Sequence, residues 1–113
     1  MERGFHAYEA ALQLVGALQP IHDAVRLADR DLADQLRPAG VSVLLNLAEG
    51  AGRAGRDRLH CYRIAPGSAR EVGAALAVAR AWGLVGACSE VVDGVLDRVL
   101  AMLWRLTHPR AGP

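Results

Sequence analysis

The sequence predicts an all-α fold, an antiparallel up-down-up-down four-helix bundle that forms a single domain over residues 1–113. Apolar residues recur at three- and four-residue steps along four segments, which short turns rich in glycine or charge separate. No segment shows the two-residue alternation that is typical of a half-buried strand. The composition is 52% hydrophobic and 4% aromatic, and this favours helices around a core of small aliphatic side chains.

The first helix is expected to run from Phe5 to Ala28. Pro20 lies inside it and cannot donate a hydrogen bond to the carbonyl of Gly16, so a kink is predicted there. A single apolar stripe recurs at helical spacing before this proline and is formed by Phe5, Tyr8, Leu12, Val15 and Leu18.

The second helix is expected from Leu32 to about Gly50, with Asp31 as its N-cap and a bend or restart at Pro38. One side of this helix is apolar and consists of Leu36, Val43 and Leu47. Most of its remaining surface is apolar as well, at Val41, Leu44, Leu45 and Ala48. A helix that is apolar almost all round is buried on more than one side. A subunit interface in a homo-oligomer is therefore predicted at Val41, Leu44 and Leu45.

Glycines punctuate the second half of the chain. Gly50, Gly52 and Gly55 should end the second helix and form the turn to a third helix, expected from about Asp57 to Trp82 with Pro66 inside it. Its inward positions are predicted to be Leu59, Tyr62, Ala65, Ala69, Val72, Leu76 and Ala79. Ser89 is expected to cap a fourth helix, which Pro109 should end. The apolar stripe of the fourth helix comprises Val92, Val95, Leu96, Val99, Leu103 and Leu106.

A narrow polar strip interrupts the apolar surface of the second helix. Ser42, Asn46 and Glu49 share one face of that helix, and Ser68 and Glu71 share a face of the third helix. Buried polar side chains must find hydrogen-bond partners. A polar clasp that joins the two helices is therefore predicted from these five residues. A small-molecule pocket near Ser42, Asn46 and Glu49 is the alternative interpretation.

The turn after the second helix and the third helix itself are rich in arginine. Arg56, Arg63 and Arg70 fall on one side of the third helix together with His60, and Arg53 and Arg58 extend this basic patch through the turn. The planar guanidinium group suits phosphate, so the patch is a candidate nucleic-acid-binding face. No aromatic residues alternate with these arginines to stack bases, and an ordinary solvated face is the competing interpretation.

Other function classes receive no support from the sequence. The net charge of +1 provides no strong overall field toward nucleic acid or membrane. The four histidines are scattered, and the cysteines follow no metal or redox spacing, so no catalytic residue, metal site or cofactor is predicted. Cys61 and Cys88 are expected to be small buried hydrophobic residues in a reducing cytosol. We expect no membrane span and a cytoplasmic location.

Four segments at the centre of the chain form a recognisable pattern: Gln35-Leu36-Arg37, Val41-Ser42-Val43, Asn46-Leu47-Ala48-Glu49-Gly50 and Ile64-Ala65-Pro66-Gly67-Ser68-Ala69-Arg70-Glu71. With this pattern the chain resembles one bacterial family, the four-helix-bundle proteins named for reading frames in intervening sequences of 23S ribosomal RNA genes. The resemblance implies an antiparallel bundle that assembles into a ring-shaped homopentamer. It also implies kinship with the accessory variability protein of diversity-generating retroelements, which binds nucleic acid and a reverse transcriptase through a basic surface.

The chain departs from the family pattern in two ways. Pro38 and Pro66 replace residues that are often basic in the family, and Leu44-Leu45 replaces a pair that is usually small or polar. These changes favour assembly over RNA binding. The leading hypothesis is a non-enzymatic oligomeric bundle that binds RNA by phosphate neutralisation at Arg53, Arg56, Arg58, Arg63 and Arg70. The alternative hypothesis is a protein–protein interaction scaffold that binds no nucleic acid and whose protein partner the sequence does not identify.

Overall fold

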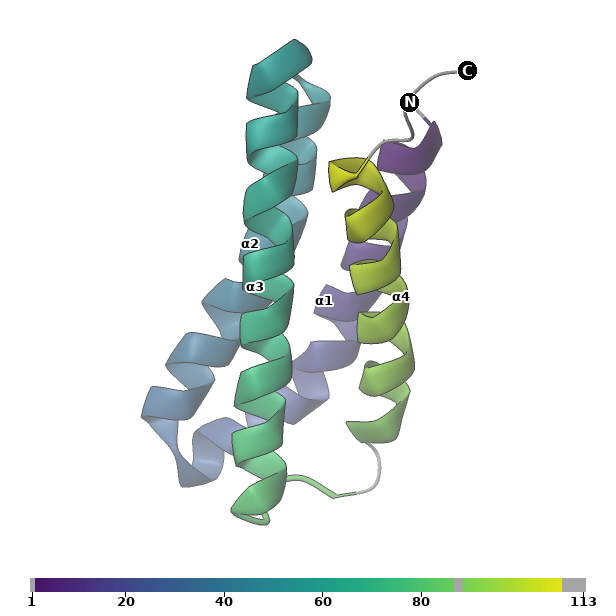
Figure 1. Ribbon diagram of the computed structural model, residues 1–113. Coiled ribbons are helices and arrows are strands. Elements are labelled where there is room, and N and C mark those ends of the chain that lie inside the picture. The colour runs from purple at the N-terminus through teal and green to yellow at the C-terminus, as the bar shows by residue number, and fades with distance from the viewer. Residues whose placement is uncertain (1, 87–88, 109–113) are drawn as a thin grey trace.

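A computed structural model describes residues 2–86 and 89–108 of the chain. These residues form four helices joined by short turns, α1 (Glu2–Ala28), α2 (Arg30–Ala51), α3 (Gly55–Ala81) and α4 (Glu90–Thr107) (Figure 1). No strand occurs in the described ranges, so the prediction of an all-α chain with four helices is confirmed. The predictions made for Cys88 and Pro109 lie outside the described residues.

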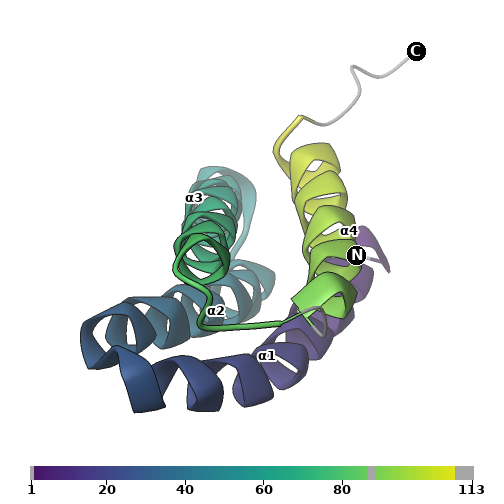
Figure 2. The same cartoon turned by 90° about the horizontal axis from the view of Figure 1, so that it is seen from below.

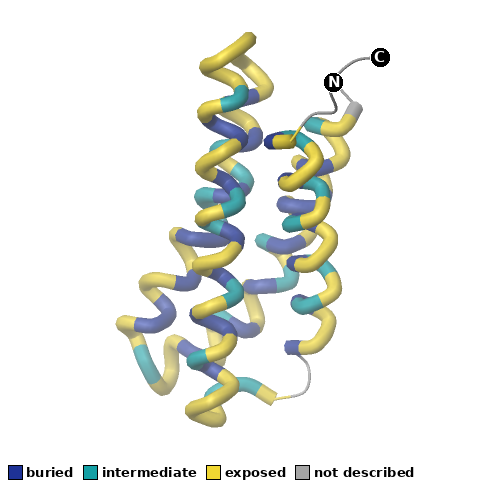
Figure 3. The backbone as a smooth tube through the Cα atoms, viewed as in Figure 1, coloured by how far each residue is buried: buried dark blue, intermediate teal, exposed yellow. Residues whose placement is uncertain are grey.

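Each helix packs against two others. Both α1 and α3 contact α2 and α4, and Figure 2 shows α3 beside α2 and α4 beside α1. The buried positions line the inner sides of the helices (Figure 3). They are almost entirely alanine, leucine and valine, as the composition predicted, and Tyr62 is the one buried residue among the described aromatic side chains.

Tyr62 joins three helix ends at one end of the molecule. Its ring lies against Gly50 near the end of α2, and its hydroxyl lies against Gly4 near the start of α1. A Cβ atom at Gly50 would stand 2.6 Å from Tyr62 Cε1, and a Cβ atom at Gly4 would stand 2.8 Å from Tyr62 Oη. Both distances are shorter than van der Waals contact allows. The two glycines therefore make room for the aromatic ring where the helices meet.

The core-facing side of α1 is not the stripe of large residues that its periodicity suggested. Phe5, Tyr8 and Leu12 are exposed, whereas Leu18 is buried as expected. The buried face instead consists of Ala7, Ala10, Ala11, Leu14, Leu18, Ile21 and Val25. Alanine side chains allow close approach of α1 to its neighbours, and α3 presents a similarly small buried face. The larger side chains of α1 are thereby left on the outside.

The N-cap of α2 and the effect of Pro38 differ from expectation. Asp29, not Asp31, is the N-cap of α2, and its side chain accepts a hydrogen bond from the backbone N–H of Leu32 at 3.0 Å. Asp31 lies in the first turn, where its negative charge still complements the helix dipole. Pro20, Pro38 and Pro66 all lie inside continuous helices, so Pro38 does not restart α2. Buried residues on both sides of each proline offset the hydrogen bond that is lost there.

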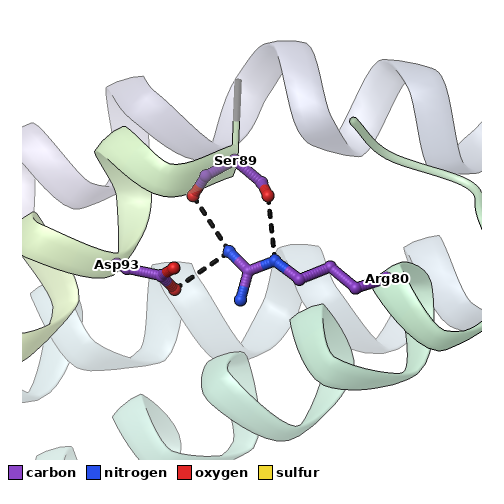
Figure 4. A network of polar contacts seen from close by, with 3 residues as sticks. All are labelled: Arg80, Ser89 and Asp93. Atoms are coloured by element: carbon purple, nitrogen blue, oxygen red, sulfur yellow. Dashed lines mark hydrogen bonds and ion pairs between the residues drawn. The ribbon is translucent and has the colours of Figure 1, made fainter. Parts of the chain in front are cut away.

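The turn between α3 and α4 is fastened by a polar network (Figure 4). Ser89 occupies the N-cap position of α4, but its hydroxyl makes no capping hydrogen bond. It accepts a hydrogen bond from Arg80 Nε at 2.9 Å, while Arg80 Nη2 donates to the Ser89 carbonyl at 3.0 Å and to Asp93 Oδ1 at 2.9 Å. Because Ser89 is only 2% exposed, Arg80 satisfies a hydroxyl that water cannot readily reach.

Candidate functional site

Three of the predicted clasp residues meet between α2 and α3. The Ser42 and Ser68 hydroxyl oxygens are 2.8 Å apart and share a hydrogen bond across the two helices. Asn46 Nδ2 donates to the Ser42 carbonyl at 2.9 Å and to Ser42 Oγ at 3.1 Å. All three residues are half-buried. The two hydroxyls and the amide nitrogen of Asn46 are thus used in hydrogen bonds within the bundle, which is the arrangement that a clasp between α2 and α3 requires.

The two glutamates assigned to the clasp lie elsewhere. Glu49 is exposed and accepts a hydrogen bond from Arg53 Nε at 3.0 Å, one turn further along the chain. This hydrogen bond, followed by the attraction of the two charges, raises the pKa of Arg53. Glu71 is exposed on α3. Longer side chains on the outer edge of a helix can reach a local partner or water, and neither glutamate joins the contact between Ser42 and Ser68.

The five arginines proposed for nucleic-acid binding are all exposed, as is His60. Two of them also shape the turn between α2 and α3. Arg58 Nε donates to the carbonyl oxygens of Arg53 at 2.8 Å and Gly50 at 3.3 Å, which satisfies acceptors at the end of α2. Arg53 is held by Glu49. Both side chains therefore have a structural partner as well as a charge.

The other three arginines form a line along α3. Arg56, Arg63 and Arg70 recur at seven-residue steps, which places them on one side of the helix. Among the residues that the structure describes, no carboxylate oxygen lies within 4.0 Å of their nitrogen atoms. Their guanidinium groups are thus available to an external anion.

A groove between α3 and α4 runs beside this line. Arg63, Pro66 and Arg70 line it from α3, and Leu100, Trp104, Thr107 and His108 line it from the end of α4. Trp104 and His108 are stacked, with ring centroids 4.3 Å apart and planes inclined by 10°. This aromatic neighbour of the arginines was not predicted from the sequence, since Trp104 lies on another helix. The available signal was the spacing of Leu100, Trp104 and His108, which share one helix face outside the core stripe.

Apolar side chains also lie on the outer side of α1 and α2. Of the predicted interface residues, Leu45 is 59% exposed, whereas Val41 and Leu44 are half-buried and Leu44 packs against the core. Val41 lines an open groove together with Val15 of α1, and the other lining residues include the polar Gln19, His22, Asp23 and Asp34. The exposed Leu12 and Tyr8 follow Val15 toward the start of α1 at helical spacing. We call the set Tyr8, Leu12, Val15, Val41, Leu44 and Leu45 the outer apolar face.

Comparison with known proteins supplies one match. The sequence pattern of a family described as 23S rRNA-intervening sequence protein matches residues 4–104, a stretch that begins in α1 and ends in α4. The chain belongs to the 23S rRNA-intervening sequence protein family. The resemblance to this family, predicted from the motifs of the central segments, is therefore confirmed. A search of curated proteins and a search of solved structures gave no match.

Residues 2–86 and 89–108 of this family member contain neither a metal site nor a membrane-spanning helix. No three His, Cys, Asp or Glu side chains lie together as a metal site would require. None of the four helices combines the length and the apolar character needed to cross a bilayer.

Proposed function

We propose that this 23S rRNA-intervening sequence protein is a non-enzymatic, oligomeric bundle protein of the cytoplasm that binds RNA through its arginine-rich face. The observation that carries the proposal is the line formed by Arg56, Arg63 and Arg70, whose exposed guanidinium groups have no carboxylate partner among the described residues. Guanidinium groups donate two parallel hydrogen bonds to phosphate oxygens. Release of counterions from the RNA backbone would drive such binding.

The five arginines take two roles in this proposal. Arg56, Arg63 and Arg70 contact phosphates directly, while Arg53 and Arg58 hold the turn and add positive charge beside it. Backbone contacts of this kind position a protein on RNA without reading its sequence. Binding should therefore depend strongly on salt and weakly on base sequence.

The test is RNA affinity measured against salt concentration for two triple variants. Arg56→Ala/Arg63→Ala/Arg70→Ala should lower affinity at low salt and reduce the slope of log affinity against log salt by about 2, because each phosphate contact contributes about 0.7 on a single strand. The matched control is Arg26→Ala/Arg30→Ala/Arg37→Ala, which removes three exposed arginines from α1 and α2. Wild-type protein that binds no RNA at low salt would contradict the proposal, as would equal effects of the two triple variants.

We also propose that the four helices form an antiparallel up-down-up-down bundle. This bundle assembles into a ring-shaped homo-oligomer, and a pentamer is the expected form. The cyclic order of the helix contacts and the meeting of helix ends at Tyr62 support the antiparallel arrangement. The outer apolar face supports assembly, since exposed leucine and tyrosine side chains on adjacent helices suit burial against another subunit.

The same outer apolar face favours a second candidate function, a protein–protein interaction scaffold that binds no nucleic acid. Apolar side chains exposed on neighbouring helices are suited to a protein surface rather than to RNA. The two candidates differ in what accompanies the purified protein from its native cells. One specific protein without RNA would favour the scaffold, and RNA that is released by salt would favour the arginine-rich face.

A further inference from the structure

The groove between α3 and α4 brings a basic helix side and an aromatic pair together. We propose that this groove holds an unpaired base of single-stranded RNA stacked on Trp104, with Arg63 and Arg70 bound to the flanking phosphates. The inference rests on the proposed RNA binding and goes further, because phosphate neutralisation alone gives no preference for single strands. The class of RNA that this face selects is thereby single-stranded RNA.

The aromatic pair is held in place before any ligand arrives. His108 Nδ1 lies 3.0 Å from the Trp104 carbonyl oxygen, which can only accept, so Nδ1 is the donor and the imidazole is fixed over the indole. Thr107, which is buried, donates from its hydroxyl to the Leu103 carbonyl at 2.9 Å and secures the same turn. An aromatic platform that is already ordered loses little conformational entropy when a base stacks on it.

The exposure of Trp104 is consistent with a missing partner. Its side chain is 60% exposed although it stacks on His108, so a large apolar area remains for contact with a ligand. Trp82 is similarly exposed, at 64%, near the opposite end of α3. The arginine closest to Trp82 in the sequence, Arg80, is already bound to Ser89 and Asp93. Trp104 therefore combines an open aromatic surface with unpaired arginines, whereas Trp82 does not.

The charges around the groove match a polyanion. Among the residues that the structure describes, its lining contains Arg63, Arg70 and His108 and no acidic residue. Of the nearby acids, Glu71 is exposed beside Arg70 on α3, and Asp97 precedes the lining residues on α4. Positive groups on one wall and stacked rings on the other are the two features that single-stranded nucleic-acid sites combine. A duplex hides the faces of its bases within the helical stack, so only an unpaired base could use the indole ring.

The experiment compares a single-stranded oligoadenylate of about twelve nucleotides with a duplex RNA of the same length. Trp104→Ala should weaken binding of the single strand by about tenfold and leave duplex binding unchanged, since stacking on one aromatic ring is lost. Trp104→Phe should keep most of the affinity. Trp82→Ala is the matched control and should change neither affinity. In a Trp82→Phe background, the oligoadenylate should also quench the fluorescence of Trp104.

The outcomes separate this inference from the function on which it rests. Wild-type protein that binds neither RNA at low salt would remove the RNA function itself. Trp104→Ala that binds the single strand as well as wild type, while Arg63→Ala/Arg70→Ala binds it weakly, would overturn stacking and leave phosphate binding intact. A Trp104→Ala variant of lower assembled mass would show that Trp104 contacts another subunit, which would also overturn the inference.

Discussion

At the scale of single residues, Gly50 shows how a missing side chain fixes the geometry of a bundle end. An added Cβ would stand 2.6 Å and 2.7 Å from two ring atoms of Tyr62 and 3.2 Å from Cys61 Cβ. The Tyr62 ring is buried, so it cannot turn into solvent to make room. The loss of helix propensity that glycine brings to α2 is thus offset by the packing of an aromatic ring.

Gly50→Ala should consequently lower the free energy of unfolding, although alanine is the better helix former. Overpacking costs about 1–3 kcal/mol and the propensity gain returns about 1 kcal/mol. Gly94→Ala in α4 is the matched control, since its Cβ would meet no atom within 4 Å, and it should raise stability by about 0.5–1 kcal/mol. Denaturant unfolding measures both changes. Equal stability of the two variants would contradict the role assigned to Tyr62.

The polar clasp between α2 and α3 shows which side-chain contacts could be predicted from the sequence and which could not. Ser42 and Ser68 were expected to meet because short polar side chains on largely apolar faces must find partners nearby, and they are hydrogen-bonded. Glu49 and Glu71 were assigned to the same contact from spacing alone. A glutamate at the edge of a face can reach out of the bundle, and Glu49 pairs with Arg53. Helical spacing identifies a shared face but not the direction of a long side chain.

At the scale of helices, α1 shows that periodicity does not say which of two stripes faces inward. Phe5, Tyr8 and Leu12 recur at helical spacing, and so do the small residues Ala7, Ala10, Ala11 and Leu14. Both stripes satisfy the pattern of an amphipathic helix. The packing against α2 and α4 selects the smaller stripe, and this choice depends on surfaces that lie elsewhere in the sequence. Element type was predictable from one segment, whereas its orientation was not.

Arg80 joins the end of α3 to the start of α4 through Ser89 and Asp93, a contact that belongs to the scale of elements. Arg80→Ala should destabilise the fold by about 1–2 kcal/mol, because the buried Ser89 hydroxyl loses its donor while the partly exposed pair with Asp93 contributes little. Arg37→Ala, at an exposed position inside α2, should change stability by less than about 0.5 kcal/mol. Thermal or denaturant unfolding of both variants measures the difference. Similar stabilities would show that the network in Figure 4 does not hold the turn.

At the scale of the whole molecule, the packing of the four helices forms surfaces from residues of different helices, which no single segment of the sequence reveals. The arginines of α3 and the ring pair of α4 meet only because the last helix packs beside the third. The sequence contained both parts, but their adjacency follows from the closure of four helices. The adjacency of residues in the outer apolar face also follows from helix packing, since Val15 of α1 and Val41 of α2 line one groove. Candidate residues could be predicted from sequence, and the surfaces they form could not.

The assembly proposal leads to a prediction about Leu45, the most exposed member of the outer apolar face on α2. Wild-type protein should sediment at several times 12.0 kDa, with five subunits expected. Leu45→Asp should lower that mass, because a carboxylate buried between subunits without a partner is strongly unfavourable. The control is Leu27→Asp, which changes a leucine that is 92% exposed near the end of α1 and should leave the mass unchanged. Folded wild-type protein that sediments as a 12.0 kDa monomer at micromolar concentration would refute assembly through this face.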